Sequence, residues 1–412
     1  MLDCLSMQTR SAEIAIVGAG PAGAHLAARL AAENRDVVLF DPKGAWEKPC
    51  GGGVPTRALR EFSYLLERGN YPRKLVRRIT MISPLQRRVS LTLDEPFAVY
   101  SRQVLNGLVL DRALEAGARF EQAAVSDFSR EGEGWRIQTS KGEAWRARLL
   151  VGADGASSFI RRRLVGIFSK DDLALAFGYN VSDVDRVASA NGNQKEGSTD
   201  DEVIVRFPKE FTGYLWAFPR PGVMNFGVAS KLGERTSDEL RALLCNFVCD
   251  FYGGRMPEAE RVSFFGAKIP TLDLATWKDL RTTGDGWVLI GDAAGFADPI
   301  TGEGIYYALK SADLLADSLV EASKSNGSSS GRANALYDER WRGSFGRDLE
   351  HASYRLPRFY RGTFFGHVFT DATIWLAAHH RGVRTILAKA LVGDQSYVTL
   401  KRDLLRRAWR IL

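Results

Sequence analysis

Short apolar runs alternate with polar segments along this chain, and three of them stop at a glycine or next to an acid. These runs cover 14–17, 149–151 and 287–290, and each is typical of a buried strand. A small-residue helical pattern that extends through Leu26 and Ala31 follows the first run. Strands that alternate with such helices predict an α/β domain.

A second pattern occurs in two blocks, where apolar and polar residues alternate with the period of half-buried strands. Pro221-Gly222 stands between two of these strands and predicts the turn of a hairpin. The strands that the pattern predicts are 79–83, 88–93, 175–181, 203–207, 214–219 and 225–229.

The order of these patterns predicts a discontinuous Rossmann-like domain, an inserted mixed β-sheet domain, and a helical C-terminal region. The fold class is therefore α/β, or α+β over the whole chain. The expected boundaries are 10–78, 100–165 and 275–325 for the first domain, 79–99 and 166–274 for the second, and 326–412 for the helical region.

Composition and charge narrow the classes of function. The chain has 412 residues, 45% hydrophobic and 25% charged, as in a globular protein of two or three domains. Its net charge is +7, and the segment from Arg340 onward carries 14 Lys and Arg against 5 Asp and Glu. This basic segment is either a solvated helical surface or a contact for anionic lipid, phosphorylated substrate or an acidic electron donor.

The sequence also disfavours several classes of protein, namely nucleic-acid-binding, disulfide-rich, metal-binding, secreted and membrane-spanning ones. No nucleic-acid-binding motif accompanies the basic charge, so we expect no nucleic-acid partner. The four scattered cysteines predict no disulfide framework, and the five histidines show no metal-ligand spacing. The first residues lack the apolar core of a signal peptide, and no apolar window is long enough to span a membrane. We expect a cytoplasmic monomer or small oligomer, with peripheral contact to the cytoplasmic membrane as a further expectation.

The first glycine cluster has the spacing of a dinucleotide-binding loop. Gly18, Gly20 and Gly23 occupy the glycine positions of G-x-G-x-x-G between a strand and a helix. Gly18 allows a tight turn, Gly20 lets a pyrophosphate approach the backbone, and Gly23 lets the helix pack close to the strand. Asp41 follows the next strand, where a carboxylate that binds ribose is expected.

Two further motifs combine glycine with an acid. Asp154 stands in Gly-Ala-Asp-Gly after one apolar run, and Asp292 stands in Gly-Asp-Ala-Ala-Gly after another. A carboxylate at a strand end accepts hydrogen bonds from sugar hydroxyls, and a helix N-terminus faces phosphate or developing negative charge. FAD offers ribose, pyrophosphate and ribityl groups, so the three motifs together favour FAD over NAD.

On these residues the sequence resembles FAD-dependent oxidoreductases with the aromatic-hydroxylase type fold, and within them the geranylgeranyl reductase family. The resemblance extends from about Ile14 to the end of the chain. Asn106 departs from it, because an aspartate is usual there. Four local matches carry it: the Lys-Pro-Cys-Gly-Gly-Gly loop at 48–53, the Tyr-x-Trp-x-Phe-Pro hairpin at 214–219 with 225–228, the Asp-Pro-x-Thr-Gly-Glu-Gly-Ile segment at 298–305, and 393–397.

The resemblance implies that FAD lies extended across the first domain. The glycine loop would hold its pyrophosphate, Asp41 its adenosine ribose, and Asp292 its ribityl chain or pyrophosphate. Asp154 would brace this domain, or it is an ordinary residue of a strand-end turn. The implied cofactor-binding residues are Gly18, Gly20, Pro21, Ala22, Gly23, Asp41, Gly51, Gly52, Arg102, Asp154, Gly155, Asp292, Pro299, Gly302 and Gly304.

Cys50 is the implied catalytic residue. Its thiol would help to hold or protonate substrate beside the flavin, although a lone cysteine is often just a small buried hydrophobe. Tyr214, Trp216 and Phe218 would line the substrate cavity, or they belong to the core. Reduction of an isolated alkene needs a hydride from flavin N5 and a proton in a water-poor pocket, which an aromatic-lined cavity meets.

The expected function is reduction of C=C bonds in a geranylgeranyl-type prenyl chain on a lipid, quinone or pigment precursor. No separate nicotinamide domain is visible, so NADPH and reduced ferredoxin are both candidate electron donors. One alternative is a flavin-dependent monooxygenase or halogenase of a small aromatic, although the Trp-x-Trp-x-Ile-Pro motif of halogenases is absent. Another is a flavin-bound redox protein at a membrane that catalyses no reaction.

Overall fold

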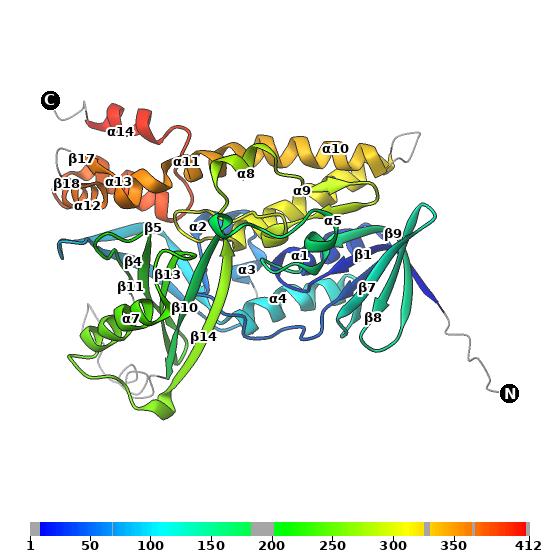
Figure 1. The fold of residues 1–412 in the computed structure, drawn as a ribbon, viewed down its shortest axis with the longest axis horizontal. Helices are drawn as coiled ribbons and strands as arrows, with labels where there is room; N and C mark the ends of the chain where they lie inside the picture. The colour runs from blue at the N-terminus through cyan, green and yellow to red at the C-terminus, as the bar shows by residue number, and fades with distance from the viewer. Residues whose placement is uncertain (1–8, 68, 183–201, 325–329, 365–366, 409–412) are drawn as a thin grey trace.

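A computed structural model describes residues 9–67, 69–182, 202–324, 330–364 and 367–408. Two large β-sheets lie at opposite ends of the molecule, and long helices run across both of them (Figure 1). This arrangement confirms the predicted α/β architecture with an inserted mixed sheet and a helical C-terminal region.

The first sheet holds all three glycine-acid motifs at one edge. Its central strand β1 runs parallel to β2 and β9, and β9 runs parallel to β16. Val17 and Leu289 both pair with Gly152, so three parallel strands end at the same level. The strands of this sheet are β1 (Arg10–Val17), β2 (Val37–Phe40), β6 (Arg119–Glu121), β7 (Val125–Glu131), β8 (Gly134–Thr139), β9 (Ala144–Gly152), β15 (Thr283–Gly284) and β16 (Trp287–Leu289).

Helix α1 (Pro21–Ala32) packs against both α4 (Arg102–Glu115) and α9 (Ile305–Ser323) beside this sheet. Alanine and glycine fill most of the buried positions of α1, which brings its backbone close to its neighbours. The shorter helices of this half are α2 (Thr56–Glu61), α3 (Tyr64–Glu67), α5 (Phe159–Leu164) and α8 (Leu274–Lys278).

The second sheet is mostly antiparallel, but β4 and β11 run parallel, so it is mixed as predicted. Helix α7 (Ser237–Phe251) packs on it through an apolar cluster around Phe226. In spatial order its strands are β14 (Val262–Pro270), β10 (Leu173–Ser182), β13 (Val223–Lys231), β12 (Gly213–Arg220), β11 (Glu202–Arg206), β4 (Arg73–Ile82), β5 (Arg88–Tyr100) and β3 (Gly53–Val54).

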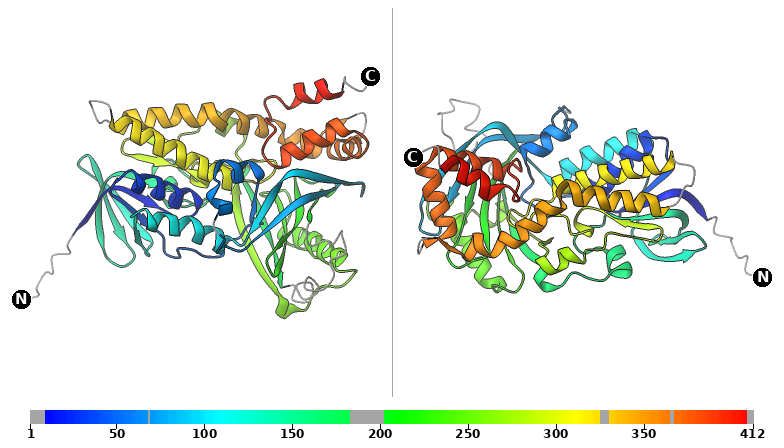
Figure 2. Two further views of the ribbon diagram at one scale, coloured as in Figure 1. Left: turned by 180° about the vertical axis from the view of Figure 1, so that it is seen from behind. Right: turned by 90° about the horizontal axis from the view of Figure 1, so that it is seen from above.

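The C-terminal helices connect the two halves. α10 packs along α9, and a π-helical turn at Arg342–Gly346 leads into α11. Helices α10 and α11 and this turn form one continuous helical segment that crosses the molecule (Figure 2). α12 and α13 then cover β5. The elements are α10 (Ser330–Trp341), α11 (Arg347–Arg361), β17 (Thr363–Phe364), β18 (His367–Val368), α12 (Phe369–His379), α13 (Arg381–Leu391) and α14 (Leu400–Ala408).

Most strands extend beyond the predicted ranges, and in the second sheet β4 and β5 do so the most. β4 begins at Arg73 instead of Ile79, and β5 continues to Tyr100. The first half of β4 is rich in Lys and Arg and mostly exposed or half-buried, so its apolar alternation is too weak to recognise. The predicted hairpin is confirmed, because β12 and β13 pair along their whole length with their turn at 221–222.

Candidate active site

A cavity of about 980 Å³ extends from the edge of the first sheet, along one face of the second, to helices α11–α14. It brings together most of the residues that the sequence singled out. Gly23 and Pro299 are the exceptions and lie outside its lining. The predicted residues that line it are Gly18, Gly20, Pro21, Ala22, Asp41, Cys50, Gly51, Gly52, Arg102, Asp154, Gly155, Tyr214, Trp216, Phe218, Asp292, Gly302 and Gly304.

The three loop glycines differ in what surrounds them. Gly18 has a φ of +105°, and a Cβ on it would clash with the carbonyl of Ala153. A Cβ on Gly23 would clash with the carbonyl oxygen of Gly18. Gly20, by contrast, has no atom within 4 Å of its Cβ position, and it lines the cavity. Two of the glycines therefore allow close backbone packing, and the middle one keeps space open beside the start of α1.

Asp41 connects the glycine loop to the segment after β2. Its Oδ2 accepts a hydrogen bond from the Ala19 amide at 2.9 Å, and its Oδ1 accepts from the amides of Lys43 and Gly44. Each carboxylate oxygen has two lone-pair directions, so Asp41 retains acceptor capacity toward the cavity that it lines.

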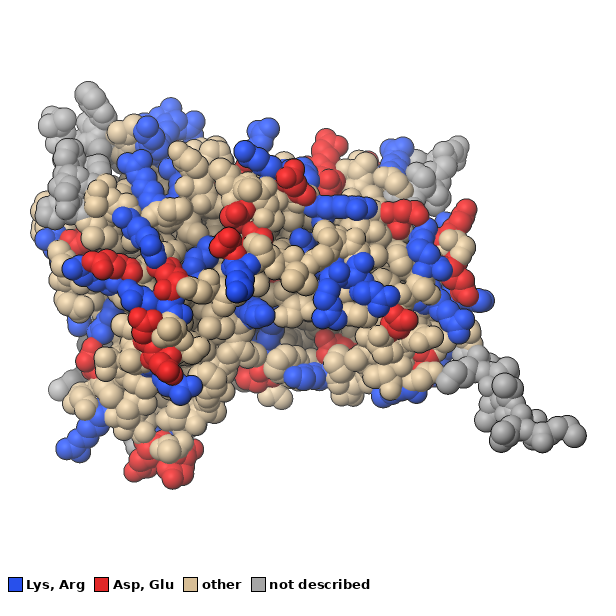
Figure 3. Space-filling model, in the orientation of Figure 1, with Lys and Arg blue, Asp and Glu red and all other residues tan. Residues whose placement is uncertain are grey.

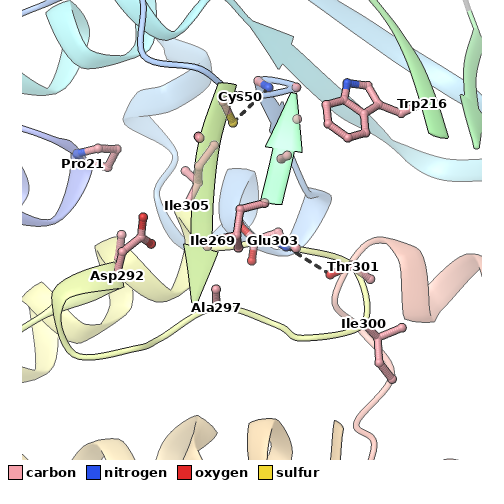
Figure 4. Close-up of a pocket in the computed structure, with 18 of the residues that line it drawn as sticks. Pro21, Cys50, Trp216, Ile269, Asp292, Ala297, Ile300, Thr301, Glu303 and Ile305 are labelled. Atoms are coloured by element: carbon pink, nitrogen blue, oxygen red, sulfur yellow. Dashed lines mark hydrogen bonds between the residues drawn. The ribbon is translucent and has the colours of Figure 1, made fainter. Parts of the chain in front are cut away.

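Asp154 and Asp292 have different surroundings. The Asp154 carboxylate accepts hydrogen bonds from the Phe159 and Ile160 amides at 2.6 and 3.2 Å, at the start of α5. Burial raises the pKa of Asp154 above its ordinary value, against the lowering effect of these hydrogen bonds. Asp292 lies 3.3 Å from the Lys48 ammonium and points into the cavity opposite Pro21 (Figure 4). Asp154 thus braces α5, whereas Asp292 and Lys48 present polar groups to the cavity.

Arg102 is a buried cation with unused hydrogen-bonding capacity. One of its Nη atoms donates to Asn106 Oδ1 at 3.3 Å, and its Nε has no partner among the described residues. Asn106 in turn donates to the Trp46 carbonyl, so the asparagine that replaces the usual aspartate still orients Arg102. Together with the open space at Gly20, this free donor beside the cavity fits the extended, acceptor-rich FAD.

The Cys50 loop is held by a residue that the sequence analysis missed. Arg220, on β12, donates to the carbonyls of Cys50 and Gly51 at 2.5 and 3.3 Å and forms an ion pair with Glu47 at 2.8 Å. The Cys50 thiol accepts a hydrogen bond from the Gly52 amide at 3.3 Å. The second sheet therefore fixes the position of a loop that belongs to the first half of the chain.

Three aromatic rings form one wall of the cavity, as their alternation along β12 predicts. Tyr214 and Trp216 have ring centroids 5.8 Å apart, and Trp216 and Phe218 are 6.3 Å apart. The Trp216 indole donates to Asn225 at 2.7 Å, and the Tyr214 hydroxyl donates to the Thr301 carbonyl. The polar ends of two of these rings are thus used internally, which leaves an apolar surface toward the cavity.

Beyond these rings the cavity continues into a channel lined by the C-terminal helices. Most of this lining is aliphatic or aromatic, and the cations Arg355, Arg358 and Lys401 stand among it. Arg358 and Lys401 are exposed, so the channel reaches the surface there. Its main apolar residues are Phe359, Phe369, Leu376, Val383, Ile386, Leu387, Leu391, Leu400, Leu404 and Leu405.

Comparison with known proteins agrees with this geometry. Residues 11–188 match the family model described as an FAD binding domain. Geranylgeranyl diphosphate reductase of Rhodobacter capsulatus is 30% identical over 303 residues, which cover 71% of each chain. The chain belongs to the geranylgeranyl reductase family. It is accordingly an FAD-dependent oxidoreductase.

Other relatives show how widely the family's fold is shared. Digeranylgeranylglycerophospholipid reductase of Methanosphaerula palustris is 28% identical over 84% of this chain and 86% of its own. A geranylgeranyl bacteriochlorophyll reductase-like structure from Thermoplasma acidophilum has a TM-score of 0.76 at 20% identity, over 97% and 99% of the two chains. A flavin-dependent brominase superposes with a TM-score of 0.70 at 15% identity, over 97% and 100%, which shows a common fold only.

Within the described part of this geranylgeranyl reductase family member, none of the helices combines the length and the apolar character needed to cross a bilayer.

Proposed function

We propose that the protein reduces C=C bonds in a prenyl chain of geranylgeranyl type, carried by a lipid, quinone or pigment precursor. One observation carries the proposal: a single cavity joins the glycine loop and the Cys50 loop to an apolar channel beneath α11–α14. A long hydrocarbon chain fits such a channel, because burial of its methylene groups is favourable. The names of the relatives from Rhodobacter and Methanosphaerula support the same substrate class.

In this proposal the first half of the cavity holds FAD. Gly18, Gly20 and Gly23 shape the pyrophosphate site, Asp41 accepts from the adenosine ribose, and Asp292 accepts from the ribityl chain or pyrophosphate. Arg102 supplies its free Nε donor. Reduced FAD supplies a hydride from N5 when it is bound. The chain's own contribution is to hold the alkene beside this position and to keep water out.

Cys50 is proposed to hold or protonate the alkene beside the flavin. It lies on a loop fixed by Arg220 and faces the same cavity as Trp216 and Ile305 (Figure 4). We expect Cys50→Ser to bind FAD as the wild type does and to lose most prenyl reduction. A Cys245→Ser variant is the matched control, because Cys245 contacts Tyr179 and does not line the cavity. Full activity in Cys50→Ser would remove the thiol from the reaction.

The whole function can be tested anaerobically. Holoprotein with reduced flavin is incubated with a panel of prenyl lipids, and the molecular masses of the products are measured by mass spectrometry. Gain of two hydrogens per reduced bond is the expected result. A hydroxylated or halogenated aromatic product under oxygen, without alkene reduction, would instead favour the monooxygenase or halogenase alternative.

The electron donor is proposed to be NADPH or reduced ferredoxin. Support comes from the cavity, whose exposed rim contains basic residues such as Lys43 and Lys268 that can attract an anionic donor. Anaerobic bleaching of the flavin by one donor but not the other would identify it.

The basic C-terminal helices are proposed to contact an anionic membrane surface peripherally, in the cytoplasm. Lys and Arg side chains gather over α14 on the face shown in Figure 3. Leu405 and Trp375 are exposed beside them, at 52% and 45%. Apolar side chains flanked by cations suit the boundary between head groups and acyl chains, where the channel would receive a lipid.

A further inference from the structure

One acidic side chain in the cavity has no role in the function proposed so far. Glu303 lies in the Gly-Glu-Gly segment just before α9, and it lines the cavity. In the view of Figure 4 its carboxyl group lies near Ile269 and above Ala297, away from Cys50. Its accessible surface therefore faces the space where substrate and flavin would meet.

Among the described residues Glu303 forms no ion pair, although Arg57 is near enough to lower the pKa of its carboxyl group slightly. Its Oε1 accepts a hydrogen bond from the Tyr306 amide at 2.7 Å, and the neighbouring Ile305 amide also acts on the carboxylate. Glu61, by contrast, forms an ion pair with Lys310 and accepts from the Tyr306 hydroxyl at 3.0 Å, outside the cavity lining. A carboxyl group that is largely removed from water and forms no ion pair favours its neutral form.

The protonation state follows from this environment. Burial raises the pKa of Glu303 to about 8. The Asp298 carboxylate adds to this rise, and the Tyr306 and Ile305 amides and the Arg57 cation oppose it more weakly. The side chain is therefore mostly a neutral acid at pH 7. Two neighbours are less suited to give up a proton. Burial raises the pKa of Tyr214 above its ordinary value, and Asp298 already accepts from two amides and the Tyr397 hydroxyl.

We propose that Glu303 is the catalytic acid that donates the proton in alkene reduction, and that of the two roles open to Cys50 the thiol then has the first, which is to hold the alkene beside the flavin. The proposal rests on the function proposed above. One alkene carbon receives the hydride that reduced FAD supplies, and the other forms a C–H bond as the Glu303 O–H bond breaks. Glu303 is left as a carboxylate and regains a proton from water. The alkene gains two hydrogens and reduced FAD is oxidised. The external donor then returns two electrons to FAD, together with one proton from the donor or from water.

The principal test compares Glu303→Gln with the matched control Glu61→Gln. Glutamine retains the acceptor for the Tyr306 amide but has no acidic proton. Holoenzymes are reduced anaerobically and mixed with a prenyl lipid, and flavin reoxidation and product mass are followed in one turnover. We expect Glu303→Gln to bind FAD normally and to reoxidise at least about a hundredfold more slowly. Glu61→Gln should behave as the wild type does.

Two readouts do not depend on turnover. The infrared spectrum of the wild-type holoenzyme at pH 7 should contain a carboxylic-acid band that is missing in Glu303→Gln and present in Glu61→Gln.

The pH dependence of stability supplies the other readout. Unfolded glutamate loses its proton near pH 4.5, whereas Glu303 in the native protein keeps it to about pH 8. Between these values the unfolded state binds fewer protons, so wild-type stability falls as pH rises. Relative to wild type, Glu303→Gln should therefore become more stable from pH 5 to pH 8.

The outcomes separate this inference from the function on which it rests. If the wild type does not reduce prenyl lipids, the proposed function fails and the role of Glu303 fails with it. If the wild type reduces them and Glu303→Gln does so at the same rate, the function stands and the role of Glu303 is overturned. A carboxylic-acid band that persists unchanged in Glu303→Gln would also overturn it.

Discussion

Glycine has opposite roles at the two ends of the cavity. At the cofactor end, backbone approaches backbone, because Gly18 and Gly23 leave no space for a side chain. At the substrate end, glycines make space for rings: a Cβ on Gly227 would clash with the Trp216 indole, and one on Gly51 would lie 3.0 Å from Phe218. The same residue type thus fixes backbone geometry in one half and accommodates side chains in the other.

This difference matches what each half must recognise. A pyrophosphate is bound by directed backbone N–H groups, so small displacements of the loop remove hydrogen bonds. A prenyl chain has no polar atoms to direct it, so volume and dryness of the channel matter more than any single contact. We therefore expect substitutions of the tightly packed glycines at the cofactor end to affect folding and FAD together, and substitutions at the substrate end to affect turnover alone.

The largest effect is expected for Gly23→Ala. The new methyl group would push α1 away from the Gly18 turn, and we expect a loss of about 3 kcal/mol in the free energy of unfolding, together with loss of FAD. Gly20→Ala is the matched control, because its methyl group enters open space. That variant should change stability by no more than about 1 kcal/mol while weakening FAD binding. Denaturant unfolding and FAD titration measure both quantities. Equal stability losses would contradict the distinction between the two glycines.

A second prediction concerns the substrate end. Gly227→Ala should displace the Trp216 indole into the cavity, since its Cβ would overlap the ring. We expect normal FAD content and a decrease in kcat/KM for prenyl reduction of between about tenfold and hundredfold. Gly266→Ala on β14 is the control, because its nearest neighbour would lie at an ordinary 3.7 Å. Loss of FAD in Gly227→Ala would show that the two ends are not independent.

How much the sequence could reveal also differs between the two ends. The glycine loop was recognisable because the residues that it needs lie within a few consecutive positions. The pairing of the parallel strands then places Val17, Gly152 and Leu289 at the same level of the sheet. The hairpin that carries Trp216 was recognisable for the same reason. Such local patterns specify strands, turns and the residues at their ends.

Contacts between distant segments could not be predicted in this way. Arg220 binds the Cys50 carbonyl across 170 positions of sequence, and neither residue's neighbours indicate the other. Glu303 stood inside a recognised motif, but its largely desolvated surroundings, without an ion pair among the described residues, depend on which segments pack around it in space. The start of β4 was missed because its arginines obscure the alternation.

The smallest effect is expected at the outer end of the channel. Arg406 on α14 is exposed beside Leu405, so Arg406→Gln should weaken binding to anionic phospholipid vesicles by about 1 kcal/mol, or about fivefold, and leave FAD content unchanged. Arg136→Gln is the control, because Arg136 is an exposed arginine on β8, at the opposite end of the molecule (Figure 1). Sedimentation with vesicles of anionic and of neutral lipid measures the difference. Equal weakening in both variants would mean that the net charge of the protein alone determines vesicle binding. The membrane would then not bind preferentially at the channel opening.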